Sequence, residues 1–141
     1  MPTVFDVAEY VLKKHGPMTT MKLQKLVYYC QAWSLVWDEA PIFDEPIEAW
    51  ANGPVVRELF ERHRGQFEVA TVEGDCKKLT KAQRETVQGV LQHYGNKSSQ
   101  WLSDLTHLEQ PWKDARANIP ESVRGKSCIS HGAMADYYGN L

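Results

Sequence analysis

Residues 20–37 read TMKLQKLVYYCQAWSLVW, and this stretch has the strongest helical pattern in the chain. Its apolar side chains recur with a period of 3.6 residues, which predicts an α-helix. The repeat is formed by Leu23, Leu26, Val27, Cys30, Trp33, Ser34 and Trp37. Tyr29, Ala32 and Val36 extend the apolar surface to another side. A helix that is apolar over so much of its circumference is covered on more than one flank, so we expect it at the centre of the fold.

The residues before this stretch predict a shorter helix and a turn. Residues 3–15 carry apolar side chains at helical spacing and end in Lys-Lys-His, and positive charge suits the C-terminal end of a helix. Gly16-Pro17 is typical of a helix stop. Thr19 or Thr20 can then cap the central helix. We favour an αα-hairpin here over a DNA-reading helix-turn-helix, because the second helix is too apolar to lie in a groove.

The segment after the central helix predicts a strand and a sharp corner. Residues 42–50 have strand character, which Pro46 weakens. In IEAWANGPVV, residues 47–56, Pro54 suits the first position of a helix, and Gly53 suits its extended N-cap. We therefore expect a strand-to-helix corner there. Two places remain open for Trp50 on the strand: between the strand and the central helix, or at the rim of a partner groove.

The second half of the chain predicts mostly helices. The alternating residues 67–72 are a candidate to pair with the strand at 42–50. Helices are expected over residues 80–95, where Thr80 and Gln83 form a capping box, from Ser98 or Ser99 to Pro111, and over 133–141. Residues 117–130 look irregular. These patterns predict a mainly α (α+β) fold: a compact bundle of about six helices around the central helix, with a small two-stranded β element.

Length and composition limit the class of protein. The 141 residues suit a single domain over 1–141, and 43% apolar and 24% charged residues are typical of globular proteins. Lys and Arg total 16 against 18 Asp and Glu, a net charge of −2, which argues against a nucleic-acid partner. The three cysteines are scattered and form no C-x-x-C, so we expect neither a disulfide framework nor a metal site. Without a signal segment or an apolar run of about 20 residues, a cytoplasmic protein with no membrane contact is expected.

Side chains that could carry chemistry form no convincing constellation. His107 and Glu109 lie two apart on a predicted helix and so point to opposite sides. Asp104 and His107 are three apart and can touch, but no nucleophile motif accompanies them. We expect no catalytic residue and no cofactor. An enzyme that acts on a small molecule or nucleotide through Asp104, His107 and Glu109 stays open as an alternative.

Two lysines at the start of the central helix are of interest as contact residues. Lys22 and Lys25 oppose the helix dipole there, at a cost of about 0.3–1 kcal/mol each if they are exposed. Either a stable core tolerates them or they contact a partner. A regulator that binds nucleic acid through these lysines and the arginines of residues 57–64 is a further alternative. Tyr29, Trp50 and Trp112 are candidate contact aromatics, with core packing as the alternative.

Three blocks of sequence together resemble a known family. KLQKLVYYCQAW at 22–33, IEAWANGPVV at 47–56 and THLEQPWKDAR at 106–116 are similar, in order and spacing, to the Panacea domain. That family includes SocA-like antitoxins and phage-associated proteins. The resemblance implies an antitoxin that neutralises a cognate toxin, encoded nearby, by direct protein binding. In the SocA-like case it implies an adapter that delivers the toxin to a AAA+ protease.

The resemblance also selects the residues to which a role is assigned. Gly53 and Pro54 match the family motif and are taken as a structural turn. The partner-binding candidates are Lys22, Lys25, Tyr29, Trp50, His107, Glu109 and Trp112. No catalytic residue, metal or cofactor is implied by the family.

Overall fold

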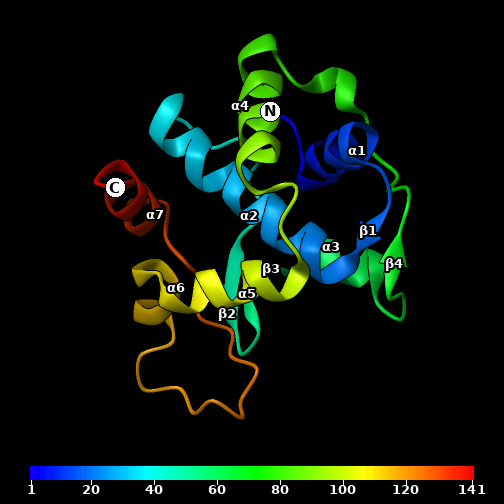
Figure 1. The fold of residues 1–141 in the computed structure, drawn as a ribbon. Coiled ribbons are helices and arrows are strands. Elements are labelled where there is room, and N and C mark those ends of the chain that lie inside the picture. Colours follow the sequence, from blue (N-terminus) through cyan, green and yellow to red (C-terminus); the bar gives the residue numbers. More distant parts are fainter.

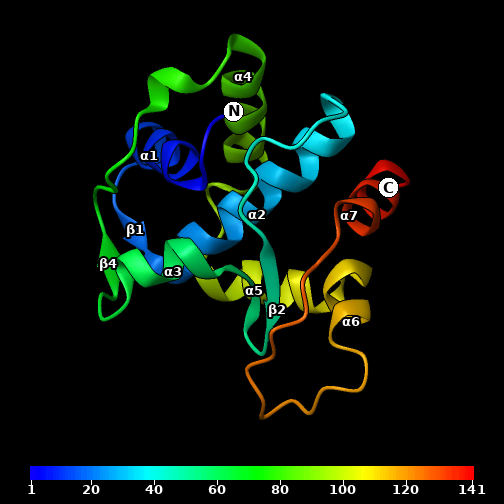
Figure 2. The ribbon, with the colours of Figure 1, turned by 180° about the vertical axis from the view of Figure 1, so that it is seen from behind.

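The central helix of the computed structural model, which describes residues 1–141, is α2 (Thr20–Trp37), as the periodicity predicts. It packs against α1 (Val4–His15), α4 (Lys81–Tyr94), α5 (Ser99–Leu108) and α7 (His131–Gly139). Figures 1 and 2 show α2 running diagonally through the molecule, with α1 and α4 toward one end. A core of 30 buried residues surrounds it, and Leu23, Leu26 and Val27 of α2 are fully buried.

Side-chain caps define where the helices begin. Thr3 and Asp6 form a capping box at α1, and Thr19 accepts a hydrogen bond from the backbone of Lys22 at α2. The predicted capping box of Thr80 and Gln83 begins α4. These bonds satisfy backbone N–H groups that have no partner within the helix.

Residues 47–56 form a β-hairpin, and the predicted strand-to-helix corner at Gly53 and Pro54 is wrong. β2 (Ile47–Trp50) pairs antiparallel with β3 (Gly53–Val56), and α3 (Arg57–His63) begins only after β3. Pro54 lies opposite Ala49, whose N–H bonds outward to Ser127 O. Pro54 therefore occupies a ladder position where its missing N–H is not required. Gly53, with φ of +122°, closes the turn.

The other small sheet joins segments far apart in the chain. β1 (Met18–Thr19) pairs with β4 (Glu68–Val69), so the predicted pairing of residues 67–72 with the 42–50 strand is wrong. The free edge of β2 is instead occupied by residues 127–129, through Ala49 N–H to Ser127 O and Ile129 N–H to Ile47 O. Strand pairing between distant segments depends on which edge stays free, which local patterns do not reveal.

The C-terminal part contains one helix more than expected. The helix predicted to run to Pro111 ends earlier, at Leu108 of α5, and Pro111 lies in the first turn of α6 (Gln110–Ala115), where a missing N–H is harmless. A 3-10 turn, η1 (Cys76–Lys78), precedes α4. Residues 117–130 are irregular, as predicted, and form the long loop at the bottom of Figures 1 and 2. The mainly α fold is confirmed, with seven α-helices and two small sheets.

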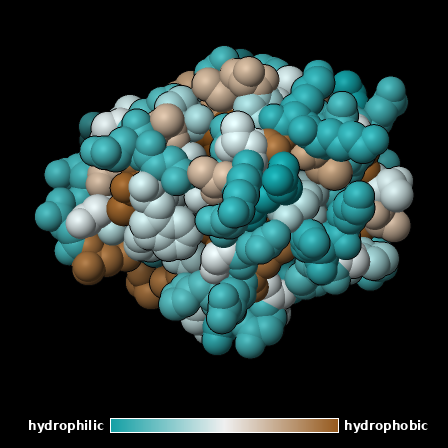
Figure 3. Space-filling view, turned by 90° about the horizontal axis from the view of Figure 1, so that it is seen from above, coloured by the Kyte–Doolittle hydropathy of each residue, from teal (hydrophilic) through white to brown (hydrophobic).

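The surface is largely polar. Hydrophilic residues predominate on the face shown in Figure 3, and apolar residues show in small patches between them. The large apolar side chains that are exposed are Met1, Trp37, Phe67, Trp101, Leu108, Val123 and Leu141. None of the helices combines the length and the apolar character needed to cross a membrane.

Candidate functional site

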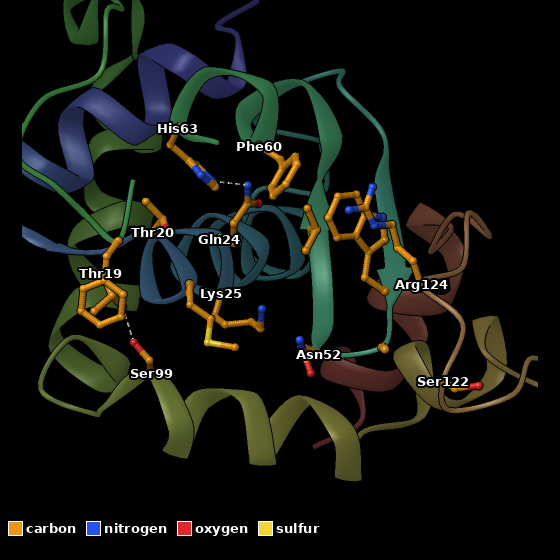
Figure 4. Close-up of a pocket in the computed structure, with 15 residues that line it drawn as sticks. Thr19, Thr20, Gln24, Lys25, Asn52, Phe60, His63, Ser99, Ser122 and Arg124 are labelled. Carbon is orange, nitrogen blue, oxygen red and sulfur yellow. Dashed lines mark hydrogen bonds between the residues drawn. The ribbon is translucent and has the colours of Figure 1, made fainter. Parts of the chain in front are cut away.

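The largest cleft of the molecule opens beside the N-terminal end of α2 and has a volume of about 580 Å³. Figure 4 shows α2 at its floor, the β2–β3 hairpin and α3 along one side, and the start of α5 opposite. Residues 122 and 124 of the long loop complete the rim. This volume lies within the range of roughly 300–1,000 Å³ typical of ligand sites.

Lys25 lies in the floor of this cleft and is only 1% exposed. Its Nζ donates one long hydrogen bond, 3.4 Å, to Pro54 O, and no carboxylate lies within ion-pair distance. Burial disfavours the charged form and lowers the pKa of Lys25 to about 8. The cost of about 0.3–1 kcal/mol for a positive charge near a helix N-terminus applies to exposed lysines. It therefore does not apply to Lys25, which is buried.

Next to Lys25, a buried amide joins α2 to α3. Gln24 Oε1 accepts from Val56 N–H at 2.9 Å, and Gln24 Nε2 lies 2.9 Å from His63 Nε2 (Figure 4). Since the Val56 bond fixes the amide orientation, Nε2 of Gln24 is the donor and His63 Nε2 accepts. Burial lowers the pKa of His63, in keeping with a neutral, accepting imidazole.

An aromatic wall faces this floor. The Trp50 and Phe60 rings meet edge to face with centroids 4.8 Å apart, and the Arg124 guanidinium lies 4.3 Å from the Trp50 centroid. Trp50 Nε1 donates to Glu48, which also pairs with Arg57 at 2.8 Å. Trp50 is thus buried and forms part of the wall of the cleft.

The loop that carries Arg124 is held by Arg116, a residue that sequence patterns did not single out. The buried Arg116 guanidinium donates to four backbone carbonyls: those of Ala49, Pro120, Val123 and Arg124, at 2.6–3.1 Å. A planar group with five donors can satisfy several carbonyls at once, which a lysine cannot. Arg116 therefore positions the rim of the cleft relative to the hairpin.

Two predicted contact residues are buried away from the cleft. Glu109 Oε1 accepts from the hydroxyls of Tyr29 at 2.7 Å and Tyr138 at 2.8 Å. Burial raises the pKa of Glu109, and these two hydrogen bonds oppose the rise. The carboxylate links α2, the α5–α6 junction and α7 from within.

The remaining candidates lie at separate places. Lys22 Nζ donates to Gly95 O at 2.7 Å, outside the cleft. The ring nitrogens of His107 lie 2.6 Å from Ser103 O and 2.8 Å from Ala51 O, and Trp112 Nε1 donates to Trp50 O at 2.8 Å. Both of these α5–α6 side chains therefore hold the hairpin. A contact with a partner stays a prediction for all seven candidates.

The side chains of the enzyme alternative do not converge. Asp104 Oδ1 accepts from Gln100, His107 faces two backbone carbonyls, and Glu109 is bound by tyrosines. No group of three or more His, Cys, Asp or Glu side chains is close enough to hold a metal ion. The cleft instead brings together aromatic and cationic side chains.

Sequence reasoning found Lys25 and Trp50 but missed Gln24, Phe60 and Arg124 as neighbours of the site. Gln24 lies in the first quoted family block, which was the only available signal for it. Phe60 is an apolar residue at helical spacing, as a core residue would be, and Arg124 lies in the loop without a pattern. Only the fold brings these segments together.

Comparison with known proteins agrees with the resemblance. A family model described as "Antitoxin SocA-like, Panacea domain" matches residues 23–113, more than half of the chain. Neither the curated proteins nor the solved structures contain a match. The matched range includes Lys25 and the hairpin, whereas Arg116 and Arg124 lie beyond it. The chain therefore belongs to the SocA-like antitoxin family that is defined by the Panacea domain.

Proposed function

We propose that this chain is an antitoxin that neutralises a cognate toxin protein by direct binding, and that the cleft above α2 is its contact surface. Family membership supports the antitoxin role in general. We choose this surface because Trp50, Phe60 and Arg124 lie together at the cleft. Aromatic and arginine side chains dominate the binding energy of protein interfaces.

An exposed aromatic residue at the same cleft supports this choice. Phe67 lines the cleft and is 80% exposed, the largest exposed fraction among the large apolar residues. Covering such a ring with a partner removes apolar surface from water, worth roughly 1.5–3 kcal/mol for a fully buried side chain. Phe67 therefore extends the contact surface beyond the cleft itself.

Direct binding is the step shared by two modes of neutralisation. The antitoxin can cover the active part of the toxin, or it can deliver the bound toxin to a AAA+ protease. We propose binding as the function common to both, and the half-life of the toxin separates them. A toxin that is neutralised while its half-life is unchanged indicates occlusion, and a shortened half-life indicates delivery.

The test co-expresses this chain with the product of the adjacent gene. We expect growth to be restored and the two proteins to co-purify. Phe67→Asp and Arg124→Glu should each reduce affinity by about tenfold or more, because an interface anchor is lost. Leu108→Asp is the matched control, since Leu108 is 73% exposed and does not line the cleft.

Two results contradict the proposal in different ways. A toxin that stays lethal and unbound removes the antitoxin role for that pair. Binding that is lost with Leu108→Asp but kept with both cleft variants moves the contact surface away from the cleft.

A further inference from the structure

The cleft has a charge composition opposite to that of the chain. Its lining residues include Lys25 and Arg124 but no Asp or Glu, although the chain has 18 acidic against 16 basic residues. A concave surface lined by one sign of charge concentrates the field and attracts ligands of the opposite sign. The lining of this cleft is thus suited to an anionic group.

Lys25 supplies the most specific part of this argument. A buried ammonium without a paired anion is costly, and buried charges in proteins are normally paired. Lys25 uses one of its three N–H donors on Pro54 O, at 3.4 Å, and no acidic side chain of the chain reaches it. Its other two donors have no partner within the chain. A carboxylate offers two acceptor oxygens and one compensating charge.

Two helix ends add to the same preference. The first residues of α2 and α5, Thr20 and Ser99, both line the cleft, and the N-cap of α2, Thr19, shares a hydrogen bond with Ser99 (Figure 4). The N-terminal end of a helix carries a partial positive charge that favours anions within its first turn. The charge of Lys25 and the partial charges of both helix ends therefore all favour binding of an anion in the cleft.

The walls of the cleft indicate what accompanies the anion. Phe60 and Trp50 form one side, and Met21 and Phe67 lie among the other lining residues. Such walls suit apolar neighbours of a charged group rather than a hydrated ion. The opening is therefore shaped for a segment that combines a carboxylate with apolar side chains.

We propose that the cleft receives a carboxylate-bearing segment of the toxin and that Lys25 is the counter-ion of this carboxylate. The inference rests on the proposed antitoxin function and adds the chemistry of the partner to it. The carboxylate displaces no internal partner, because Lys25 has no ion pair to break. The remaining charge of the cleft, on Arg124 at the rim, is free to contact acidic residues beside the segment.

The decisive variant is Lys25→Met, which keeps most of the length of the unbranched side chain but removes its charge. We expect toxin affinity to fall by about 10- to 100-fold, the range for losing hydrogen bonds to a charged group. The free energy of unfolding should be unchanged or higher, because an unpaired buried charge has been removed. Lys81→Met is the control, since Lys81 is an exposed lysine of α4 that does not line the cleft and is not a contact candidate.

The partner side of the contact is identified by replacing acidic toxin residues one at a time with Asn or Gln. One replacement should weaken binding to the wild-type chain by a similar factor and have no further effect with Lys25→Met. If the effect of every acidic replacement in the toxin simply adds to that of Lys25→Met, the assignment of Lys25 as the counter-ion is overturned. Equal affinity of the wild-type chain and Lys25→Met would overturn it too, while toxin binding by the wild-type chain keeps the antitoxin function itself intact.

A second arm separates a toxin segment from a free small acid. The chain alone is titrated with 3-phenylpropanoate and with 3-phenylpropanamide and followed by NMR at the Gly53 amide and the Trp50 indole. Stronger binding of the carboxylate, lost in Lys25→Met, supports a carboxylate subsite. If that binding is seen while Lys25→Met holds the toxin as tightly as the wild-type chain, the subsite serves a small acid and the proposal for the toxin is overturned.

Discussion

Lys25 lies directly against Gly53: a Cβ added to Gly53 would be 2.5 Å from Cε of Lys25. Gly53 also has φ of +122°, a conformation that side chains rarely adopt. Two separate features therefore favour glycine at position 53. One is its positive φ, and the other is the close approach of the Lys25 side chain. This contact couples the hairpin to the floor of the cleft.

Gly53→Ala should destabilise the chain by about 2–5 kcal/mol, the combined range for backbone strain and overpacking. In a double-mutant cycle with Lys25→Ala, the two changes should be non-additive by about 1–3 kcal/mol, because the shortened lysine removes the steric part. Urea unfolding of the four proteins measures this coupling. Strict additivity would show that the backbone conformation alone requires glycine.

The charge of Lys25 should make stability depend on pH. Burial lowers its pKa from 10.5 to about 8, so between these values the unfolded chain binds more protons than the folded chain. Stability therefore rises with pH across this window, relative to Lys25→Met, and the difference is constant below pH 8. Over the whole range from pH 8 to 10.5, the free energy of unfolding should change by about 3 kcal/mol, at roughly 1.36 kcal/mol per pH unit.

Urea unfolding of both proteins from pH 7 to 10 provides this comparison. The buried tyrosines titrate alike in the two proteins, so their contribution cancels in the difference. A difference that stays flat over the whole range would mean that folding does not lower the pKa of Lys25.

Replacing Glu109 should separate its role as hydrogen-bond acceptor from its charge. Glu109→Ala leaves the buried Tyr29 hydroxyl without its acceptor and should cost about 2–4 kcal/mol, whereas Glu109→Gln keeps an acceptor oxygen and should cost clearly less. Thermal or urea unfolding at neutral pH ranks the two variants. Equal losses would indicate that the carboxylate charge itself stabilises the fold.

The raised pKa of Glu109 gives a second signature. As the pH rises above about 4.5, the Glu109 carboxyl loses its proton in the unfolded chain before it does so in the folded chain. The stability of the wild-type chain should therefore fall with rising pH until Glu109 is ionised in the folded chain as well. Glu109→Gln should lack this fall. Unfolding curves between pH 4 and 7 for the two proteins check it, and parallel curves would contradict a raised pKa.

Arg116 should control the order of the long loop. Arg116→Ala removes the donors to four carbonyls and should speed backbone amide exchange over residues 117–125, with a stability loss of about 2 kcal/mol or more. Arg116→Lys should rescue little, because an ammonium does not reach all four. Hydrogen-exchange mass spectrometry is the measurement. Lys113→Ala, an exposed change on the same helix, is the control and should leave exchange unaltered.

Local patterns predicted the helices well but not the hairpin. The caps at Thr3, Thr19 and Thr80 act over three residues, so the sequence alone reveals them. Pro54 is compatible with both a helix start and a strand. The choice depends on Ser127, more than 70 positions away, which takes the outward N–H of Ala49. A local rule has no access to that partner.

The cleft was predictable only in part, for the same reason. Lys25 and Trp50 stood out through residue type and family resemblance, yet the burial of Lys25 becomes visible only when the hairpin lies over it. Arg124 reaches Trp50 because Arg116 holds the loop in place. Contacts between segments so distant in sequence follow from the tertiary fold.

The boundary of the family match passes through the cleft. Lys25 and Gly53 lie within residues 23–113, and Ser122 and Arg124 lie outside. The inner pair is held by close packing between α2 and the hairpin turn, whereas Arg124 is held by a loop that the guanidinium of Arg116 fastens to the hairpin. One binding surface thus has two kinds of mechanical support, a rigid base and a tethered rim.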